Sequence, residues 1–398
     1  MSDVLPFPAV RAGKCPFDPP PALRDLQDQE PLTRVRLWDG SQPWLVTRYA
    51  EQRTLLADSR LSSDLHQPGY PAAAPIRTGG DTIGFILMDD PEHARLRRMV
   101  TAPFAMKRVA AMRPAVQAIV DRLIDELLAG PNPVDLVEAF ALPVPSLVIC
   151  ELLGVPYDDH EFFQANSKKL ISRSVPADER GAAFQAVHDY LVALLATKAE
   201  QPAADVLSQL NERVANGELT RREAAGIGVL LLIAGHETTA NMIALGTAAL
   251  LEHPGQLALL RDSDDPALVT NAVEELLRYL TITHNGRRRV ALADIEIAGQ
   301  VIKAGEGVIL PNDIGNRDPS MYADPDRLDL TRDARRHLAF GFGVHQCLGQ
   351  PLARLELEVV YGTLYRRIPT LRLATDLAKV PFKHDGSVYG VYELPVSW

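Results

Sequence analysis

The sequence predicts a mainly helical protein with small antiparallel sheets, which is an α+β fold. The strongest helical signal runs from Thr220 to Leu251, where a threonine–glutamate capping pair opens a long apolar stretch that ends before Pro254. At ~1.5 Å per residue this helix would be about 48 Å long, enough to cross the whole molecule. Alternating apolar residues predict strands in two regions, residues 32–49 and 290–310, and the second region contains a predicted turn at Ala298-Gly299-Gln300.

Other elements follow from turn and capping signals. Asp39-Gly40 predicts the turn of a hairpin, and residues 50–57 predict a short helix after it. Asp89-Asp90-Pro91 predicts a helix start, because acidic residues and proline are favoured there. Apolar periodicity predicts helices in three further segments, residues 110–129, 136–153 and 158–196, and Asp265-Pro266 starts another.

Composition indicates a globular protein. Of its 398 residues 46% are hydrophobic and 23% are charged, and no apolar run approaches the roughly 18 residues that span a bilayer. Residues 1–30 are rich in proline and predict an extended arm without signal-peptide features, so we expect a cytoplasmic monomer that contacts no membrane. The net charge of −10 argues against nucleic-acid binding. Cys15 and Cys150 receive no role.

The segment Phe340–Gly349, FGFGVHQCLG, is the most informative stretch of the chain. Cys347 precedes an amphipathic helix, whose N-terminus can stabilise the thiolate that binds metals. The glycines permit tight turns against a flat cofactor, and Phe340 and Phe342 can exclude water. A structural zinc site needs four ligands, so one axial thiolate to a porphyrin-held iron fits better. The alternative is a buried structural cysteine.

The motif AGHETT lies in the middle of the long predicted helix. Gly235 costs a helix roughly 1 kcal/mol relative to alanine, and Glu237 and Thr238 place an acid and a hydroxyl in an apolar helix, a conflict that often marks function. A gap at Gly235 could admit dioxygen, Thr238 could hydrogen-bond it, and Glu237 could relay protons. Alternatively, the Thr238 hydroxyl bonds its own helix. A zinc site at His236 is excluded, because Ala240 stands where a second histidine is required.

Together these motifs resemble the cytochrome P450 family of monooxygenases. The cysteine loop is similar to its haem-binding loop, and AGHETT matches its oxygen-activation motif. The resemblance covers nearly the whole chain except the N-terminal arm. It implies a single cytochrome P450 domain over residues 1–398, with haem b between the long central helix and the cysteine loop and with Cys347 as the iron ligand.

The resemblance also implies residues that hold the haem. His93 and Arg97, which share one face of their helix, match partners of the haem propionates, and buried carboxylates need such cations. Arg289 and His345 match two further partners, although Arg287 and Arg288 are neighbours that a one-residue slip could confuse with Arg289. The loop residues Phe340 and Gly349 complete the cofactor-binding set.

The resemblance further implies a structural network beside the cysteine loop. Glu275 and Arg278 lie three residues apart on a predicted helix and can pair. In the family this pair forms a buried network with a later arginine, which Arg327 matches. Removing one partner would leave a buried charge, at a cost of roughly 3 to 5 kcal/mol.

The implied reaction inserts one oxygen atom of O2 into a C–H bond of a large hydrophobic substrate, such as a macrolide or other polyketide, a sterol-like molecule or a foreign compound. GFGVHQ is not a dinucleotide fingerprint, so the electrons must come from a partner. The resemblance implies a small acidic ferredoxin with an NAD(P)H-dependent ferredoxin reductase. Basic stretches at residues 93–113 and 332–354 would form its docking site.

Three alternatives remain open. A peroxygenase would use H2O2 directly, but such enzymes tend to lack the acid and alcohol that Glu237 and Thr238 supply. A non-catalytic haem-binding sensor would have no use for that pair. A purely structural helical protein would need neither Cys347 nor several convergent cationic side chains.

Overall fold

The computed structural model describes residues 4–11, 15–75, 84–171, 175–384 and 386–398. The chain forms two compact units, Met1–His93 with Glu274–Cys347 and Ala94–Val273 with Leu348–Trp398. Two helices, α3 (Glu92–Thr101) and α12 (Pro266–Leu280), begin in one unit and end in the other. The single domain expected for residues 1–398 stays a prediction.

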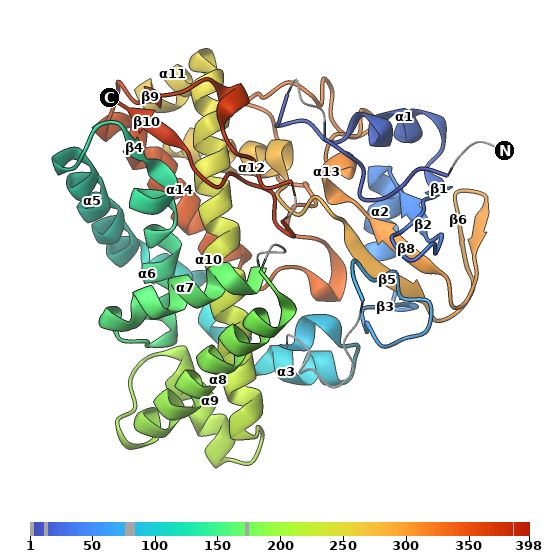
Figure 1. The fold of residues 1–398 in the computed structure, drawn as a ribbon, viewed down its shortest axis with the longest axis horizontal. Coiled ribbons are helices and arrows are strands. Elements are labelled where there is room, and N and C mark those ends of the chain that lie inside the picture. The colour runs from blue at the N-terminus through green and yellow to red at the C-terminus, as the bar shows by residue number, and fades with distance from the viewer. Residues whose placement is uncertain (1–3, 12–14, 76–83, 172–174, 385) are drawn as a thin grey trace. The chain divides into compact units, whose positions relative to one another are not determined.

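The second unit is built around α10 (Arg221–Glu252), the 32-residue yellow helix of Figure 1. Thr220 caps it as the sequence predicts: its hydroxyl accepts a hydrogen bond from the Glu223 N–H at 3.1 Å, and a Glu223 carboxylate oxygen accepts one from the Thr220 N–H at 2.7 Å. The helix is apolar and long enough to cross a membrane, but 78% of an apolar 18-residue stretch of it is buried inside the protein, as in a core helix.

Helices of the same unit surround α10. Those that contact it are α6 (Pro143–Leu153), α7 (His160–Ile171), α8 (Ala177–Glu200), α9 (Val206–Ala215), α11 (Pro254–Asp262), α14 (Gln350–Arg367) and a π-helical segment, Val137–Ala141. Both α4 (Met106–Ala111) and α5 (Arg113–Ala129) pack on α14. The helices predicted in residues 110–129, 136–153 and 158–196 are therefore confirmed.

A small antiparallel sheet closes the second unit. Its strands lie in the order β4 (Val134–Asp135), β10 (Pro395–Ser397), β9 (Arg372–Leu373). Just before β10, the segment Phe382–Val391 folds back on itself through a bridge between its two end residues. The chain therefore returns to α10 and its neighbours at its C-terminal end.

The first unit contains a five-stranded sheet. The order is β1 (Leu32–Arg34), β2 (Trp44–Val46), β8 (Gly307–Leu310), β5 (Arg287–Ala291), β3 (Leu61–Ser62). Every pair is antiparallel, as predicted, except β2 with β8, which run parallel. Distant chain segments supply this pair, so no hairpin turn dictates its orientation.

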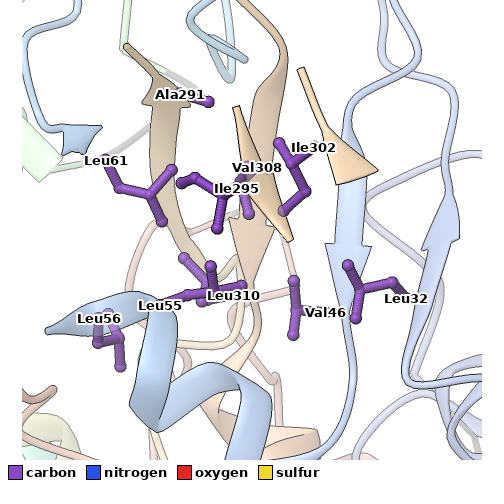
Figure 2. Packing of buried hydrophobic residues seen from close by; sticks show 10 residues of the cluster. All are labelled: Leu32, Val46, Leu55, Leu56, Leu61, Ala291, Ile295, Ile302, Val308 and Leu310. Atoms are coloured by element: carbon purple, nitrogen blue, oxygen red, sulfur yellow. The ribbon is translucent and has the colours of Figure 1, made fainter. Parts of the chain in front are cut away.

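A hydrophobic core lies against this sheet, and Figure 2 shows side chains from β1, β2, β3, β5 and β8 pointing into it. The helix α2 (Tyr49–Leu56) adds Leu55 and Leu56. The hairpin of β6 (Ile295–Ile297) and β7 (Gln300–Ile302) adds Ile295 and Ile302. The predicted turn of that hairpin is confirmed, with Ala298 and Gly299 at φ of 47° and 74°.

The N-terminal arm differs in part from the expectation for residues 1–30. Its last third forms a helix, α1 (Pro21–Gln29), with proline in the first turn and with Leu23 and Gln27 buried one turn apart. The two Gln27 amide hydrogens are donated to the carbonyls of Thr47 and Ile314. Short polar helices of this kind are stabilised by such tertiary contacts rather than by their own periodicity.

A buried ion-pair network lies in the first unit, and it corrects one predicted member. Glu275 and Arg278 pair at 2.7 Å with both side chains fully buried, as expected. The third member is Arg332, whose Nε lies 3.2 Å from Glu275 Oε1. Arg327 instead has a 65% exposed side chain that pairs with Asp329, because its backbone faces the network and its side chain points away.

Replacing Glu275 with glutamine should destabilise the protein by about 3 to 5 kcal/mol, because the Arg278 guanidinium would stay buried without its counter-charge. Urea denaturation measures this loss. Arg332→Met should also destabilise, whereas Arg327→Met should leave the midpoint unchanged, since an exposed pair contributes little. Equal losses for the two arginine variants would contradict the assignment of Arg332.

Candidate active site

The cysteine loop closes through its own backbone. The Cys347 N–H donates to the Phe340 carbonyl at 2.9 Å, and the Gln346 N–H donates to the Gly343 carbonyl at 3.0 Å. Gly349 then caps α14, so the thiol lies two residues before a helix N-terminus, where partial positive charge favours a thiolate. The predicted placement of Cys347 is confirmed.

Two glycines of the loop have conformations and surroundings that exclude a side chain. Gly341 and Gly343 have φ of 72° and 74°, in the left-handed region. A Cβ on Gly341 would lie 2.8 Å from the Arg287 Nε, and one on Gly343 would lie 2.4 Å from the Leu56 carbonyl oxygen. The loop backbone therefore rests directly on a strand arginine and on the end of α2.

The two predicted histidines meet beside this loop. The rings of His93, from α3, and His345 lie 4.1 Å apart between centroids. His93 Nδ1 is 3.0 Å from a carboxylate oxygen of Asp90, while its buried Nε2 has no hydrogen-bond partner among the described residues. A protonated His93 donates from both nitrogens, so Nε2 is left for an anion that the protein itself does not supply.

Strand β5 places two arginines on one face. Because side chains alternate along a strand, Arg287 and Arg289 share a face, and Arg288 points to the other, where it donates to the Pro71 carbonyl. Burial, together with the charge of Arg287, lowers the pKa of Arg289 to about 10. Burial also lowers the pKa of Arg287, and the nearby Cys347 partly opposes that shift.

Arg287 is a residue that sequence reasoning named only as a neighbour of Arg289. Its Nε is buried without a hydrogen-bond partner in the part of the chain that the structure describes. The alternation of side chains along β5 that places Arg289 on this face also places Arg287 there, so the sequence pattern indicates both arginines. Its guanidinium also donates to the Ala339 carbonyl at 3.5 Å. A half-buried cation with an N–H left over suits an anionic ligand, and the two carboxylates of haem b match this requirement beside a thiolate loop.

The AGHETT residues lie on α10 in the second unit. Glu237 is buried, whereas Gly235 and Thr238 are partly exposed on an otherwise buried helix. The Thr238 hydroxyl donates to the Ala234 carbonyl at 2.8 Å, which is the alternative that the sequence left open. A Cβ on Gly235 would lie 3.0 Å from Ile149 of α6, so this glycine makes room for a core side chain. Its role in admitting dioxygen stays a prediction.

The predicted site residues divide between the units. Within the first unit the structure brings together His93, His345 and the cysteine loop, with Arg287 beside Cys347. The second unit holds Arg97, Gly235, Glu237, Thr238 and Gly349. His93 and Arg97 lie one turn apart on α3, as predicted. Among the described residues, no three His, Cys, Asp or Glu side chains gather as a metal site.

Comparison with known proteins decides the family. The family model described as Cytochrome P450 matches residues 179–368. Over its full length the chain is 57% identical, across 400 residues, to cytochrome P450 GfsF of Streptomyces halstedii, of which it covers 97%. The chain belongs to the cytochrome P450 family. It is also 53% identical over 402 residues to cytochrome P450-SU2 of Streptomyces griseolus, covering 98% of that protein.

Solved P450 structures agree with the fold. The crystal structure of GfsF matches with a TM-score of 0.94, covering 99% of this chain and all of that one. The mycinamicin VIII C21 methyl hydroxylase MycCI of Micromonospora griseorubida, bound to mycinamicin VIII, matches with a TM-score of 0.91 at 41% identity, covering 99% of this chain and all of that one. This P450 is therefore a haem-thiolate monooxygenase with haem b as its cofactor. It acts on a small molecule with electrons from redox partners.

Gly343→Ala should destabilise this P450 and lower its haem content. A left-handed non-glycine residue costs roughly 1–2 kcal/mol, and the new Cβ would clash with the Leu56 carbonyl. Thermal unfolding and the haem-to-protein absorbance ratio measure the two effects. Gly255→Ala is the control, because open space surrounds that position on α11. An unchanged melting temperature for Gly343→Ala would contradict the proposed constraint.

Proposed function

We propose that this P450 inserts one oxygen atom from O2 into a C–H bond of a large hydrophobic molecule. The observation that carries the proposal is the pairing of two features on one chain: a single cysteine at a helix N-terminus, and an acid–alcohol pair inside the apolar helix α10. The first suits an axial thiolate, and the second suits proton delivery.

Residues of the cysteine loop, of α3 and of β5 would hold the haem. Cys347 would bind the iron, and Phe340 with Gly349 would border the loop around it. The propionates would bind His93, His345 and Arg289, and Arg97 on α3 would join them. A thiolate-bound haem supplies electron density that favours O–O cleavage. The buried Nε2 of His93, which has no hydrogen-bond partner among the described residues, supports this assignment.

Glu237 and Thr238 would move protons. The Thr238 hydroxyl donates to its own helix, which leaves its oxygen free to accept a hydrogen bond. Glu237, one residue earlier and 3% exposed, is an acid shielded from bulk water. Stepwise transfer from Glu237 to Thr238 would therefore deliver protons singly while the site excludes solvent.

The substrate is a large apolar compound in this proposal. MycCI is named for hydroxylating mycinamicin VIII. A relative from Streptomyces fradiae, 41% identical over 396 residues, is named 20-oxo-5-O-mycaminosyltylactone 23-monooxygenase, and a 49% identical relative from Streptomyces griseolus is named vitamin D3 dihydroxylase. These names support a macrolide-like or sterol-like ligand over a small polar one.

The electron donor in this proposal is a small acidic ferredoxin, reduced by an NAD(P)H-dependent reductase. Within residues 93–113, Arg95 pairs with Glu223, and Arg113 pairs with Glu358. The side chains of Lys107 and Arg108 on α4 are exposed and could meet an acidic partner. We further infer that the enzyme works in the cytoplasm as a monomer.

Cys347→Ala should abolish the red-shifted Soret band that thiolate-bound haem gives after dithionite reduction and addition of carbon monoxide. The absorption spectrum of the purified protein measures it. Cys15→Ala is the matched control, since that cysteine lies outside the loop and should leave the band intact. A band that survives in Cys347→Ala would overturn the ligand assignment.

Thr238→Ala should keep consuming NADPH with the redox partners but release H2O2 in place of product, because proton delivery is impaired. Product and peroxide per NADPH are measured together. Thr197→Ala on α8 is a matched control, because its hydroxyl also bonds an alanine carbonyl four residues earlier. Unchanged product yield would contradict the relay. Product formed equally well from H2O2 alone would favour a peroxygenase, and no turnover would favour a sensor.

Lys107→Glu with Arg108→Glu should raise the KM for ferredoxin several-fold, and the effect should shrink at high salt because the charges are exposed. Steady-state rates at varied ferredoxin and ionic strength measure it. Arg372→Glu on β9 reverses one positive charge elsewhere in the second unit, where the double variant reverses two. An effect of Arg372→Glu half as large as that of the double variant would indicate a general charge effect and contradict a local docking site.

A further inference from the structure

The C-terminal segment Phe382–Val391 reaches the buried acid of α10. Lys383 Nζ lies 3.7 Å from Glu237 Oε2, and the two side chains are 15% and 4% exposed. The lysine is 146 positions away in the sequence, and no motif in the sequence connects it with AGHETT. This contact is therefore visible only in the folded protein.

The backbone around Lys383 is fixed by its own turn. The Lys383 N–H donates to the Gly390 carbonyl at 2.9 Å, and Phe382 bridges to Val391. The rings of Phe382 and Tyr389 stack at 5.9 Å between centroids. These contacts tie the backbone at Lys383 to Gly390 and Val391, which reduces the entropy lost when the long lysine side chain pairs.

The same turn packs directly on α10. A Cβ on Gly390 would lie only 1.9 Å from Asn241 Oδ1, so the turn approaches the helix more closely than any other residue type would allow. Asn241 in turn donates through Nδ2 to the Glu237 carbonyl at 2.7 Å and to Glu237 Oε2 at 3.2 Å. Lys383 and Asn241 therefore converge on one carboxylate oxygen.

This arrangement gives the buried Glu237 carboxylate both a cation and a hydrogen-bond donor. A buried carboxylate needs positive charge and hydrogen-bond donors close by. The adjacent His236 does not supply that charge at neutral pH, because burial lowers its pKa. Lys383 and Asn241 supply the charge and a donor, respectively.

We propose that Lys383 is a positioning residue for proton delivery, pairing with the Glu237 carboxylate and orienting it on α10. The C-terminal turn thereby determines how efficiently protons reach Thr238. For each proton delivered, solvent water supplies one proton to the Glu237 carboxylate, Glu237 gives one to the Thr238 hydroxyl as that hydroxyl releases its own, and Glu237 returns to the carboxylate paired with Lys383. This inference rests on the proposed function, because it assigns Lys383 to the same relay.

A double-mutant cycle on the haem-loaded protein tests the pairing independently of turnover. Lys383→Met should lower the urea midpoint, because it leaves Glu237 buried without its counter-charge. Glu237→Gln combined with Lys383→Met should lose less than the sum of the two single variants. Infrared difference spectra should show a shift of the Glu237 carboxyl band in Lys383→Met that is absent from the double variant. Additive losses without this band shift would overturn the pairing.

Turnover then tests the positioning role. Lys383→Met should divert NADPH electrons from product to H2O2 several-fold, and Lys383→Arg should restore most of the product yield because it keeps the charge. Lys379→Met is the matched control: it lies four residues away, and its pair with Asp376 is largely exposed. Unchanged product yield in Lys383→Met would overturn the inference.

The two proposals fail in distinguishable ways. If Thr238→Ala forms as much product per NADPH as the unmodified enzyme, the relay itself is wrong, whatever Lys383 does. If Thr238→Ala releases H2O2 in place of product while Lys383→Met keeps the full product yield, only the role of Lys383 is wrong. A normal carbon monoxide spectrum in every variant confirms that the haem site is intact in the comparison.

Discussion

The buried guanidinium of Arg278 is the interaction on which the cysteine loop depends. It pairs with Glu275 at full burial and donates to the carbonyls of Asn316 and Pro325. The Asn316 side chain then accepts from the Leu338 N–H at 2.7 Å, just before the loop begins. A buried charge tolerates little displacement of its partners, so irregular backbone without sheet or helix bonds acquires a fixed path toward Cys347.

The functional groups in the first unit share a second constraint, which is burial of charge without complete satisfaction by the protein. His93 Nε2 and Arg287 Nε lack partners among the described residues, and burial lowers the pKa values of Arg287 and Arg289. Such groups destabilise a protein unless a ligand compensates them. Their presence beside a glycine-rich thiolate loop is what a dianionic, iron-containing cofactor requires.

Glu237 differs from these groups, because the protein itself supplies its partners. Lys383 and Asn241 both reach its carboxylate, and they come from a C-terminal turn and from the next turn of α10. A carboxylate held in this way has its charge compensated without being exposed to bulk solvent. The apolar helix can therefore carry a buried acid at a modest cost in stability.

The sequence by itself determined the local elements: the capped helix α10 with its acid–alcohol pair, the hairpin turn at Gly299 and the cysteine before α14. These features depend on capping, periodicity and turn chemistry over a few residues, which spacing reveals. Tertiary structure decided which distant side chains meet: Arg332 with Glu275, and Lys383 with Glu237. Such pairings depend on how the backbone directs each side chain after packing. The local sequence does not distinguish Arg332 from the nearby Arg327, so it could not indicate which arginine pairs with Glu275.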